Sequence, residues 1–381
     1  CASLAIQNFV ELSTTDPGFQ PEKTLMVGVS LPPEQYKTLE QRNLFDRELV
    51  ENVRNLPGVE AAAIGNGGMP YGGWQSAYSI EGQPRVDGQQ IVVSFISSNY
   101  LRTLGIPLER GRAFTPEEVQ DGMHVALINE TAAKLWRAGQ DASNGHIQID
   151  FLGQPFKPPF LAAPGISPDM TIVGVVGDTK NYGLAEATQP AVYVPYTLVA
   201  PPGRQLAVRT YGDPMLILNA VRAKLRGMDR NLPLVRPMTI DEIMGYETAQ
   251  PRFNMFLFSA FAGLGLMLAA IGIYCVVSYN ITQRVREIGV RMALGATRGD
   301  ILIWVLRMVL RVGLLGLLLG FCGSFAVERM MRSYLFGKFS FNVVSLAGVV
   351  LVLAAVALLA TWLPARRAGK MDPVTARRHE A

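Results

Sequence analysis

The side chains that most often carry out chemistry are few in this chain, and their spacing does not group them. The three histidines, His124, His146 and His379, form no helix-period pair and have no cysteine partner, so no metal site is expected. The sequence shows no Gly-x-Ser-x-Gly, no Walker lysine and no paired carboxylates in a recognisable frame. Asp178 follows an apolar stretch and could act as a base, but such a residue more often caps a turn. These observations disfavour enzyme activity within the chain.

Residues 65–74, GNGGMPYGGW, are rich in glycine and invite comparison with a phosphate-binding loop. Such a loop needs a Lys followed by Ser or Thr, and a helix that opens directly after it. Neither feature is present, so this stretch is expected to be a connection or a hairpin.

Long apolar runs dominate the last third of the chain. Residues 253–281, 301–327 and 343–363 are each long enough to cross a hydrocarbon core, which takes about 20 residues. Residues 1–250 hold 20 Lys and Arg against 26 Asp and Glu, and residues 251–381 hold 15 against 5, giving net charges of −6 and +10. Because the positive charge flanks apolar runs, it indicates membrane topology rather than nucleic-acid binding.

Two basic clusters set the expected orientation. They are Arg284, Arg286, Arg291 and Arg298 after the first run, and Arg366, Arg367, Lys370, Arg377 and Arg378 after the third. The link between the second and third runs has fewer basic residues, namely Arg329, Arg332 and Lys338. The positive-inside rule therefore places residues 282–300 and the C-terminus in the cytoplasm and residues 21–250 outside.

The polar segment between the first two runs, QRVREIGVRMALGATRGD (283–300), has the pattern of a short amphipathic helix. Its apolar and small residues recur at helical spacing and its charged residues lie largely on other faces, with Gly295 closing the helix. One interpretation is an interfacial helix that binds anionic lipid. The other is a docking surface for a cytoplasmic protein.

The apolar runs themselves contain charged and small residues. Arg307 and Arg311 lie one helical turn apart, and snorkelling to headgroups is favoured over a substrate pathway because no acidic partner lies within the run. Gly316 with Gly320, and Gly265 with Ala269, have the small-xxx-small spacing that lets helix backbones approach closely. Three helices cannot enclose a pathway, so a partner is expected.

The pattern of residues 21–250 predicts an α+β domain of two parts. Strand 24–31, helix 35–55 and strand 59–64 form one β-α-β unit, and strand 205–210, helix 214–228 and strand 232–238 form a second. Between them, strands and turns dominate. Thr239 is expected to open a short helix toward Tyr246, followed by a short linker and the first apolar run.

The start of the chain has two interpretations. Cys1 could be the first residue of a lipoprotein after signal cleavage, or residues 1–20 could be the tail of a preceding transmembrane helix and a linker. The second is favoured, and the chain is then a fragment of a longer polypeptide.

REIGVRMALGATRGDI (286–301), followed by an apolar run, resembles the signature of the MacB/FtsX-type ABC-transporter permeases. PARRAGKMDPVTARR (364–378) is similar to the closing motif of that family, and TIVGVVGDTKNYGL (171–184) with AVYVPY (191–196) resembles its extracytoplasmic core domain. The start at Cys1 is similar to the C-terminal half of a duplicated, acidobacterial-type permease, in which the ATPase is a separate chain.

The resemblance implies a fold and its boundaries. Residues 21–250 would form a MacB-like periplasmic core, with a porter part (21–95 and 203–250) interrupted by a sabre-like insertion (96–202). Residues 251–381 would form an FtsX-like permease module with three transmembrane helices. The protein would lie in a bacterial inner membrane.

The resemblance also implies a function. A separate cytoplasmic ABC ATPase, which binds ATP and Mg, would drive mechanotransmission to the periplasmic domain and export, while this chain holds no cofactor. Other partners would be a second permease half or copy, a periplasmic or outer-membrane protein and lipids, but not nucleic acid. The residues at the coupling contact would be Arg284, Arg286, Glu287, Ile288, Gly289, Arg291, Leu294, Gly295 and Ala296.

Two alternatives stay open. A family member can act by transmembrane signalling or lipoprotein extraction, without small-molecule transport. From a different class, the chain could be a membrane-anchored binding or sensor domain with no ATPase.

Overall fold

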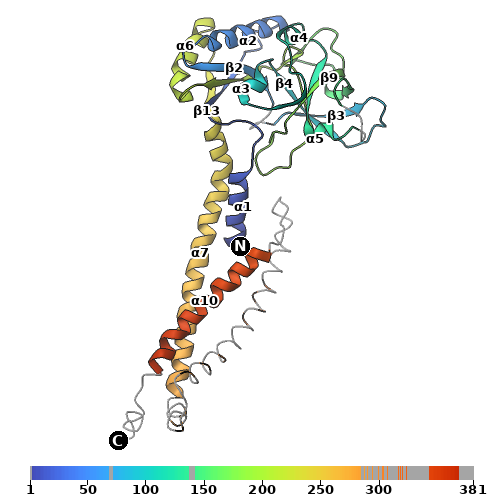
Figure 1. Ribbon diagram of the computed structural model, residues 1–381. Helices are drawn as coiled ribbons and strands as arrows, with labels where there is room; N and C mark the ends of the chain where they lie inside the picture. The colour runs from blue at the N-terminus through green and yellow to red at the C-terminus, as the bar shows by residue number, and fades with distance from the viewer. Residues whose placement is uncertain are drawn as a thin grey trace. The chain divides into compact units, whose positions relative to one another are not determined.

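The computed structural model describes residues 2–67, 72–136, 142–284 and 343–368, with single positions between 287 and 323. By its internal contacts the chain divides into two compact units. One is Leu12–Gln250, and the other combines Cys1–Glu11 with Pro251–Ala381 (Figure 1). Each unit is described by itself below.

The Leu12–Gln250 unit is built on one large sheet whose strands follow the order β10-β6-β9-β7-β3-β4-β2-β12-β1-β13, with β5 added beside β9. The strands are β1 (Thr24–Ser30), β2 (Val59–Asn66), β3 (Trp74–Ile80), β4 (Gln90–Ile96), β5 (Leu108–Gly111), β6 (Val125–Asn129), β7 (His146–Ile149), β9 (Asp169–Val176), β10 (Ala191–Pro195), β12 (Gly203–Thr210) and β13 (Leu234–Thr239). A separate small sheet pairs β8 (Leu161–Ala162) with β11 (Val199–Ala200).

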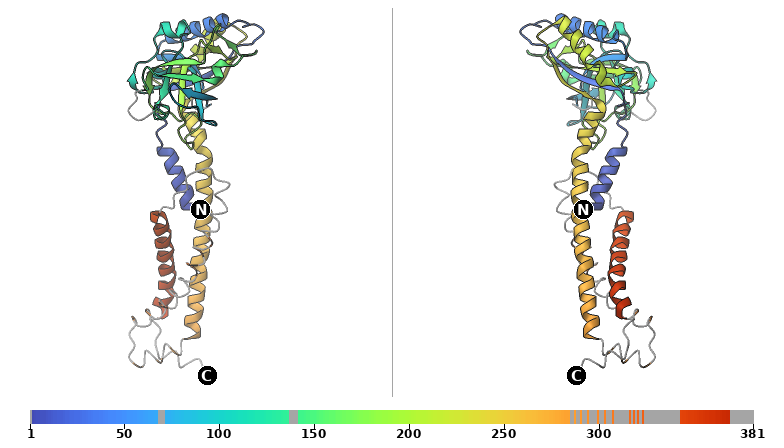
Figure 2. Two further views of the ribbon diagram at one scale, coloured as in Figure 1. Left: turned by 90° about the vertical axis from the view of Figure 1, so that its right-hand side faces the viewer. Right: turned by 90° about the vertical axis from the view of Figure 1, so that its left-hand side faces the viewer.

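The half of the sheet formed by β2, β12, β1 and β13 is antiparallel throughout, and α2 (Leu39–Arg54) and α6 (Leu218–Met228) lie together on one of its faces (Figures 1 and 2). Helix α2 begins where Thr38 and Gln41 form a capping box, which satisfies amide groups at the helix start. Helix α6 buries Val221 and Leu225, and the 3-10 turn η2 (Pro214–Ile217) precedes it. The apolar core of this layer includes Leu25, Leu49, Val221 and Leu225.

The other half of the sheet closes into a ring of six strands. Strand β10 has two partners: it pairs antiparallel with β6 and parallel with β4, the latter from Ala191 opposite Val92 to Pro195 opposite Ile96. These pairings close the ring. Because β4 is also the strand that meets β2, one strand belongs to both halves. A second apolar core fills this region, with Phe95, Leu127 and Ile147 fully buried. Short helices lie around it: α3 (Tyr100–Leu104), α4 (Pro116–Gln120), α5 (Glu130–Ala133) and η1 (Asp150–Gly153).

The glycine-rich stretch joins β2 to β3. Both strands pair with β4 and not with each other. The hairpin alternative is therefore wrong, and the stretch is a connection. Strand β3 itself was missed by the sequence pattern, although Ser76, Tyr78 and Ile80 alternate toward the interior.

Helix α7 (Ile240–Gln283) is one continuous helix of 44 residues. Its start is capped reciprocally: the Glu242 amide donates to the Thr239 hydroxyl at 3.1 Å, and the Thr239 amide donates to the Glu242 carboxylate at 2.9 Å. Thr239 therefore opens a helix, as predicted, but the expected linker before the apolar run is wrong. The helix accommodates Pro251 in its interior instead of ending there.

The second unit contains part of α1 (Ala2–Thr14), most of α7 and α10 (Val343–Ala368). Within the described residues, α7 is the helix long and apolar enough to cross a membrane, and α10 contains a shorter apolar stretch, Val350–Trp362. The predicted runs 253–281 and 343–363 fall within these two helices. Most of the run 301–327 lies outside the described residues.

Candidate coupling site

The predicted coupling residues lie between Arg284 and Ala296, and we call residues 284–296 the coupling segment. It begins directly after the end of α7. The Arg284 amide donates to the Ile281 carbonyl at 3.1 Å, which closes the last turn of the helix. Arg284 Nη1 then lies 3.6 Å from Glu287 Oε2, and both side chains are nearly half exposed. An exposed i,i+3 ion pair of this kind stabilises the fold only weakly.

Leu294 is the third predicted coupling residue among the described positions. Its amide donates to the Val290 carbonyl at 3.0 Å, a helical i,i+4 bond, and its side chain is 83% exposed. An apolar side chain this exposed beside charged groups suits a contact with another surface. The other predicted coupling residues lie outside the described residues: Arg286, Ile288, Gly289, Arg291, Gly295 and Ala296.

The predicted helix-packing residues face open space. Gly265 and Ala269 on α7 are exposed, and a Cβ at Gly265, Gly316 or Gly320 would meet no described atom within 4 Å. Their role in helix contacts stays a prediction for a partner helix.

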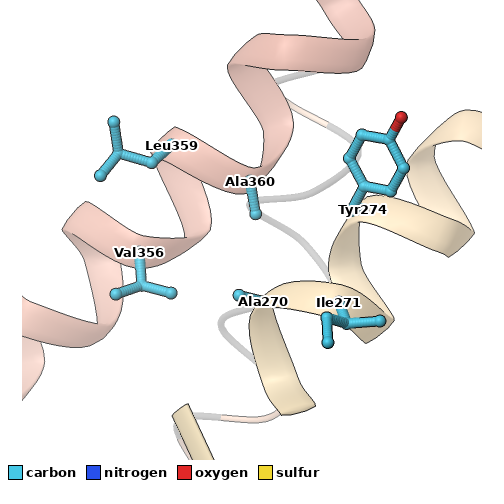
Figure 3. Close-up of a pocket in the computed structure, with 6 residues that line it drawn as sticks. All are labelled: Ala270, Ile271, Tyr274, Val356, Leu359 and Ala360. Carbon is cyan, nitrogen blue, oxygen red and sulfur yellow. The ribbon is translucent and has the colours of Figure 1, made fainter. Parts of the chain in front are cut away.

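The contact that the structure does show between α7 and α10 uses other residues. Ala270, Ile271 and Tyr274 on α7 face Val356, Leu359 and Ala360 on α10 across a shallow apolar pocket (Figure 3). In Figure 3, Ala270 lies toward Val356 and Tyr274 toward Ala360, so the two helices run in the same direction at this contact. The sequence pattern did not single out these positions.

The clearest electrostatic feature of the Leu12–Gln250 unit is a buried ion pair between α2 and β12. Arg204 Nε donates to Asp46 Oδ2 at 3.1 Å, and both side chains are 1% exposed. Burial is the largest influence on both groups: it raises the pKa of Asp46 to about 6 and lowers the pKa of Arg204, against their mutual attraction.

This pair belongs to a larger network that holds the segment between β10 and β12. Arg204 Nη2 donates to the Tyr196 and Val199 carbonyls, and Arg42 Nη1 donates to the Ala200 carbonyl at 2.8 Å. The network is structural, because Arg204 Nη2 and Arg42 Nη1 both donate to backbone carbonyls. Charged residues on an amphipathic helix usually face solvent, so no sequence pattern indicated this network.

The residues considered for chemistry have ordinary structural roles. Asp178 accepts hydrogen bonds from the Thr131 amide at 2.9 Å and its hydroxyl at 2.7 Å, so it helps to cap the first turn of α5 rather than a turn of its own segment. His124 Nε2 accepts from the Ser167 amide, and His146 Nδ1 lies 3.4 Å from the Thr171 hydroxyl. His379 is outside the described residues, and the described ones gather no group of three metal-ligating side chains.

Two family models match this chain. The model of the MacB-like periplasmic core domain matches residues 5–226, and the model of the FtsX-like permease C-terminal region matches residues 259–373.

Two curated relatives are both described as export ATP-binding/permease proteins. The chain is 27% identical over 297 residues to the macrolide export ATP-binding/permease protein MacB 1 of Yersinia pestis, covering 74% of this chain and 42% of the relative. A probable export ATP-binding/permease protein of Pseudomonas fluorescens is 26% identical over 295 residues, again with 74% and 42% coverage. The chain thus spans about two fifths of the length of these relatives.

Solved structures with a similar description align at low similarity. The periplasmic region of MacB from Actinobacillus actinomycetemcomitans aligns at a TM-score of 0.38 and 10% identity, covering 62% of this chain and 97% of that one. The extracellular domain of the transporter YknZ from Gram-positive bacteria aligns at 0.35 and 11%, covering 56% and 100%. The assignment rests on the family models instead: since the periplasmic-core model alone matches more than half of the chain, the protein belongs to the MacB/FtsX-like permeases of ABC transporters, with a MacB-like periplasmic core domain before an FtsX-like permease region.

Proposed function

We propose that this chain is the permease subunit of a bacterial inner-membrane complex in which ATP hydrolysis by a separate cytoplasmic ABC ATPase changes the shape of the periplasmic domain and drives export. The ATPase supplies the ATP and Mg sites, and this chain transmits force. The observation that carries the proposal is the continuity of α7, which runs from its Thr239 cap on the sheet to Gln283, directly before the coupling segment. A continuous helix passes displacement along its axis better than two helices joined by a linker.

The names of the relatives support the assignment of an ATPase partner. They are ATP-binding/permease proteins more than twice as long as their aligned part, and the part shared with this chain is matched by two permease models. The ATP-binding function is therefore assigned to another polypeptide or to another part of a longer one.

The direction of the helices supports the proposed topology. Because α7 and α10 run in the same direction where they touch, two membrane-crossing helices would bring Gln283 and the end of α10 to the same side (Figure 3). Both basic clusters follow these ends, and the positive-inside rule assigns that side to the cytoplasm. Residues 282–300 then face the ATPase, and residues 21–250 form the periplasmic porter and sabre-like parts.

The coupling contact is assigned to Arg284, Glu287 and Leu294 together with the intervening residues of the segment. Charged groups and an exposed leucine within this short stretch of sequence would give a partner both an electrostatic and an apolar anchor. Gly265, Ala269, Gly316 and Gly320 are assigned to contacts with a second permease half or a second copy.

The test is to purify the full permease with its ATPase and measure complex formation and coupled ATP hydrolysis. Glu287→Arg reverses a charge at the proposed contact and should lower both. Glu51→Arg makes the same charge reversal at an exposed position of α2, distant from Glu287 in the sequence. It should leave complex formation and ATP hydrolysis unchanged. Normal assembly and turnover in Glu287→Arg would contradict the docking assignment.

A further inference from the structure

The chain enters the Leu12–Gln250 unit through a tight turn, residues 16–20, whose backbone lies directly against the segment after β9, residues 177–183. We call these the entry turn and the connector. Gly18 in the entry turn has φ +80°, and a Cβ there would lie 1.8 Å from the Asp178 carbonyl oxygen. The Lys180 amide donates to the Pro17 carbonyl at 3.0 Å. Two backbones therefore touch with no side chain between them, which glycine alone permits.

The entry turn is fixed on its other side to the body of the unit. Phe19 is buried in the apolar core that also fills the ring of strands. The Gln20 amide donates to the Leu104 carbonyl at 2.8 Å, and Arg209 on β12 donates to both the side-chain and main-chain oxygens of Gln20. The turn is thus held in place rather than lying loosely on the surface.

The connector is bound in turn to three elements of the ring. Asp178 caps α5 through Thr131, and the Thr179 hydroxyl lies 2.9 Å from the Tyr193 hydroxyl on β10. The Asn181 carbonyl accepts from the Gly72 amide, just before β3. Displacement of the connector would therefore act on α5, β10 and β3 together.

The start of α7 meets the same connector. A Cβ at Gly183 would lie 2.8 Å from Glu247 Oε2, so the carboxylate lies over the glycine backbone. Ile240 and Ile243 on the first turn of α7 are buried in the same core as Phe19. The connector therefore touches both the entry of the chain into this unit and its exit.

We propose that the contact between Gly18 and the connector is a joint that stays closed throughout the ATPase cycle. It passes displacement of the chain that precedes the entry turn to the six-stranded ring, and Gly18 is its positioning residue. This rests on the proposed function, because it specifies the route by which ATP-driven movement reaches the periplasmic domain. Asp178, Thr179 and Lys180 are the connector residues that carry it.

The test uses the full permease with its ATPase in lipid nanodiscs and compares amide hydrogen exchange with and without ATP. In the wild type, ATP should change exchange in the connector and in β4 and β10. Gly18→Ala forces a Cβ against the Asp178 carbonyl and opens the joint, so the ATP-dependent change in the ring should be lost while ATP hydrolysis continues. The matched control is Gly88→Ala: Gly88 has φ +82° but nothing described within 4 Å, so this variant carries the backbone strain without the clash and should respond like the wild type.

A second arm holds the joint closed, and it can still overturn the proposal if Gly18→Ala fails to fold. Pro17→Cys with Lys180→Cys, with Cys1, Cys275 and Cys322 replaced by Ser, places two thiols on residues whose backbones are hydrogen-bonded. Because the proposed joint never opens, the protein with the disulfide between positions 17 and 180 should keep the ATP-dependent change in hydrogen exchange.

Three results would overturn the proposal. Loss of the change on oxidation would mean that the joint must open, and a full change in a folded Gly18→Ala would mean that the joint is not the route. A wild type that hydrolyses ATP with no change anywhere in residues 12–250 would refute the proposed function, and this inference with it.

Discussion

Arg204 on β12 and Asp46 on α2 form a charged hydrogen bond of 3.1 Å inside the Leu12–Gln250 unit, where each side chain is 1% exposed. Asp46 Oδ1 and Arg204 Nη1 have no hydrogen-bond partner among the described residues. Removing two charges from water costs several kcal/mol per ion, and incomplete hydrogen bonding leaves part of that cost uncompensated. The pair therefore fixes how α2 meets the β10–β12 segment more than it adds net stability.

Removing one partner should be far worse than removing both. Arg204→Met leaves Asp46 buried without its cation and should destabilise the unit by about 3–5 kcal/mol. Asp46→Leu combined with Arg204→Met removes both charges and should recover a measurable part of that loss, although the Tyr196 and Val199 carbonyls still lose a donor. Urea unfolding of residues 12–250 measures both values. A double variant as unstable as Arg204→Met alone would show that the pair is stabilising as a whole.

The same site predicts an unusual dependence of stability on pH. Burial raises the pKa of Asp46 to about 6 in the folded protein, above its ordinary 3.8. The folded state then binds the proton more readily than the unfolded state, so this group's contribution to stability improves as pH falls from about 6 to about 4. Above pH 6 the cost of the buried carboxylate is fully present.

Asp46→Asn provides the comparison for this prediction. The difference in unfolding free energy between wild type and variant should change between pH 7 and pH 4.5 in favour of the wild type, by about 1–3 kcal/mol. Glu118 does not produce this slope: hydrogen bonding from Arg112 lowers its pKa below 4.5, so its stabilising contribution is lost only at more acidic pH. A constant difference across this range would contradict a raised pKa at Asp46.

The parts of the fold that the sequence predicted are those with a strong local pattern. Ile217, Val221 and Leu225 recur at helical spacing and are all buried, and β1 and β2 appear where apolar runs end at prolines or glycines. The closure of the ring was not predictable in this way, because the pairing of β10 with β4 joins residues about a hundred positions apart. Local pattern carries no information about such a pairing.

The functionally interesting residues likewise divide into those with a local sequence signal and those without one. The coupling segment stays a prediction, drawn from charge and helical spacing within one short stretch. The Asp46–Arg204 pair and the contact of Gly18 with Asp178 were not predictable, because each depends on two segments that only the fold brings together. The linker expected before the first apolar run was wrong, because α7 continues from Ile240 through Pro251 into that run.

The cap of α7 predicts a local loss of stability. Thr239→Ala removes the hydroxyl that accepts from the Glu242 amide and should cost about 0.5–2 kcal/mol. Thr38→Ala removes the equivalent group from the capping box of α2 and serves as the comparison. Hydrogen exchange should rise at the first turn of α7 in Thr239→Ala and at the first turn of α2 in Thr38→Ala. An unchanged exchange rate at Ile243 in Thr239→Ala would show that burial of Ile240 and Ile243, rather than the cap, holds this end of the helix.

The proposed topology places two exposed side chains in different compartments. Val86, between β3 and β4, is 52% exposed, and Leu294 in the coupling segment is 83% exposed. In a chain with Cys1 and Cys322 replaced by Ser, a membrane-impermeant thiol reagent should label Val86→Cys in intact spheroplasts and Leu294→Cys only after the membrane is opened. Cys275 is exposed on the apolar part of α7 and serves as an internal control, since lipid should shield it from the reagent before and after opening. Labelling of both introduced cysteines in intact spheroplasts would place the coupling segment and the core domain on one side of the membrane. No cytoplasmic ATPase could then act on that segment while the domain changes shape in the periplasm, because force would have no membrane to cross.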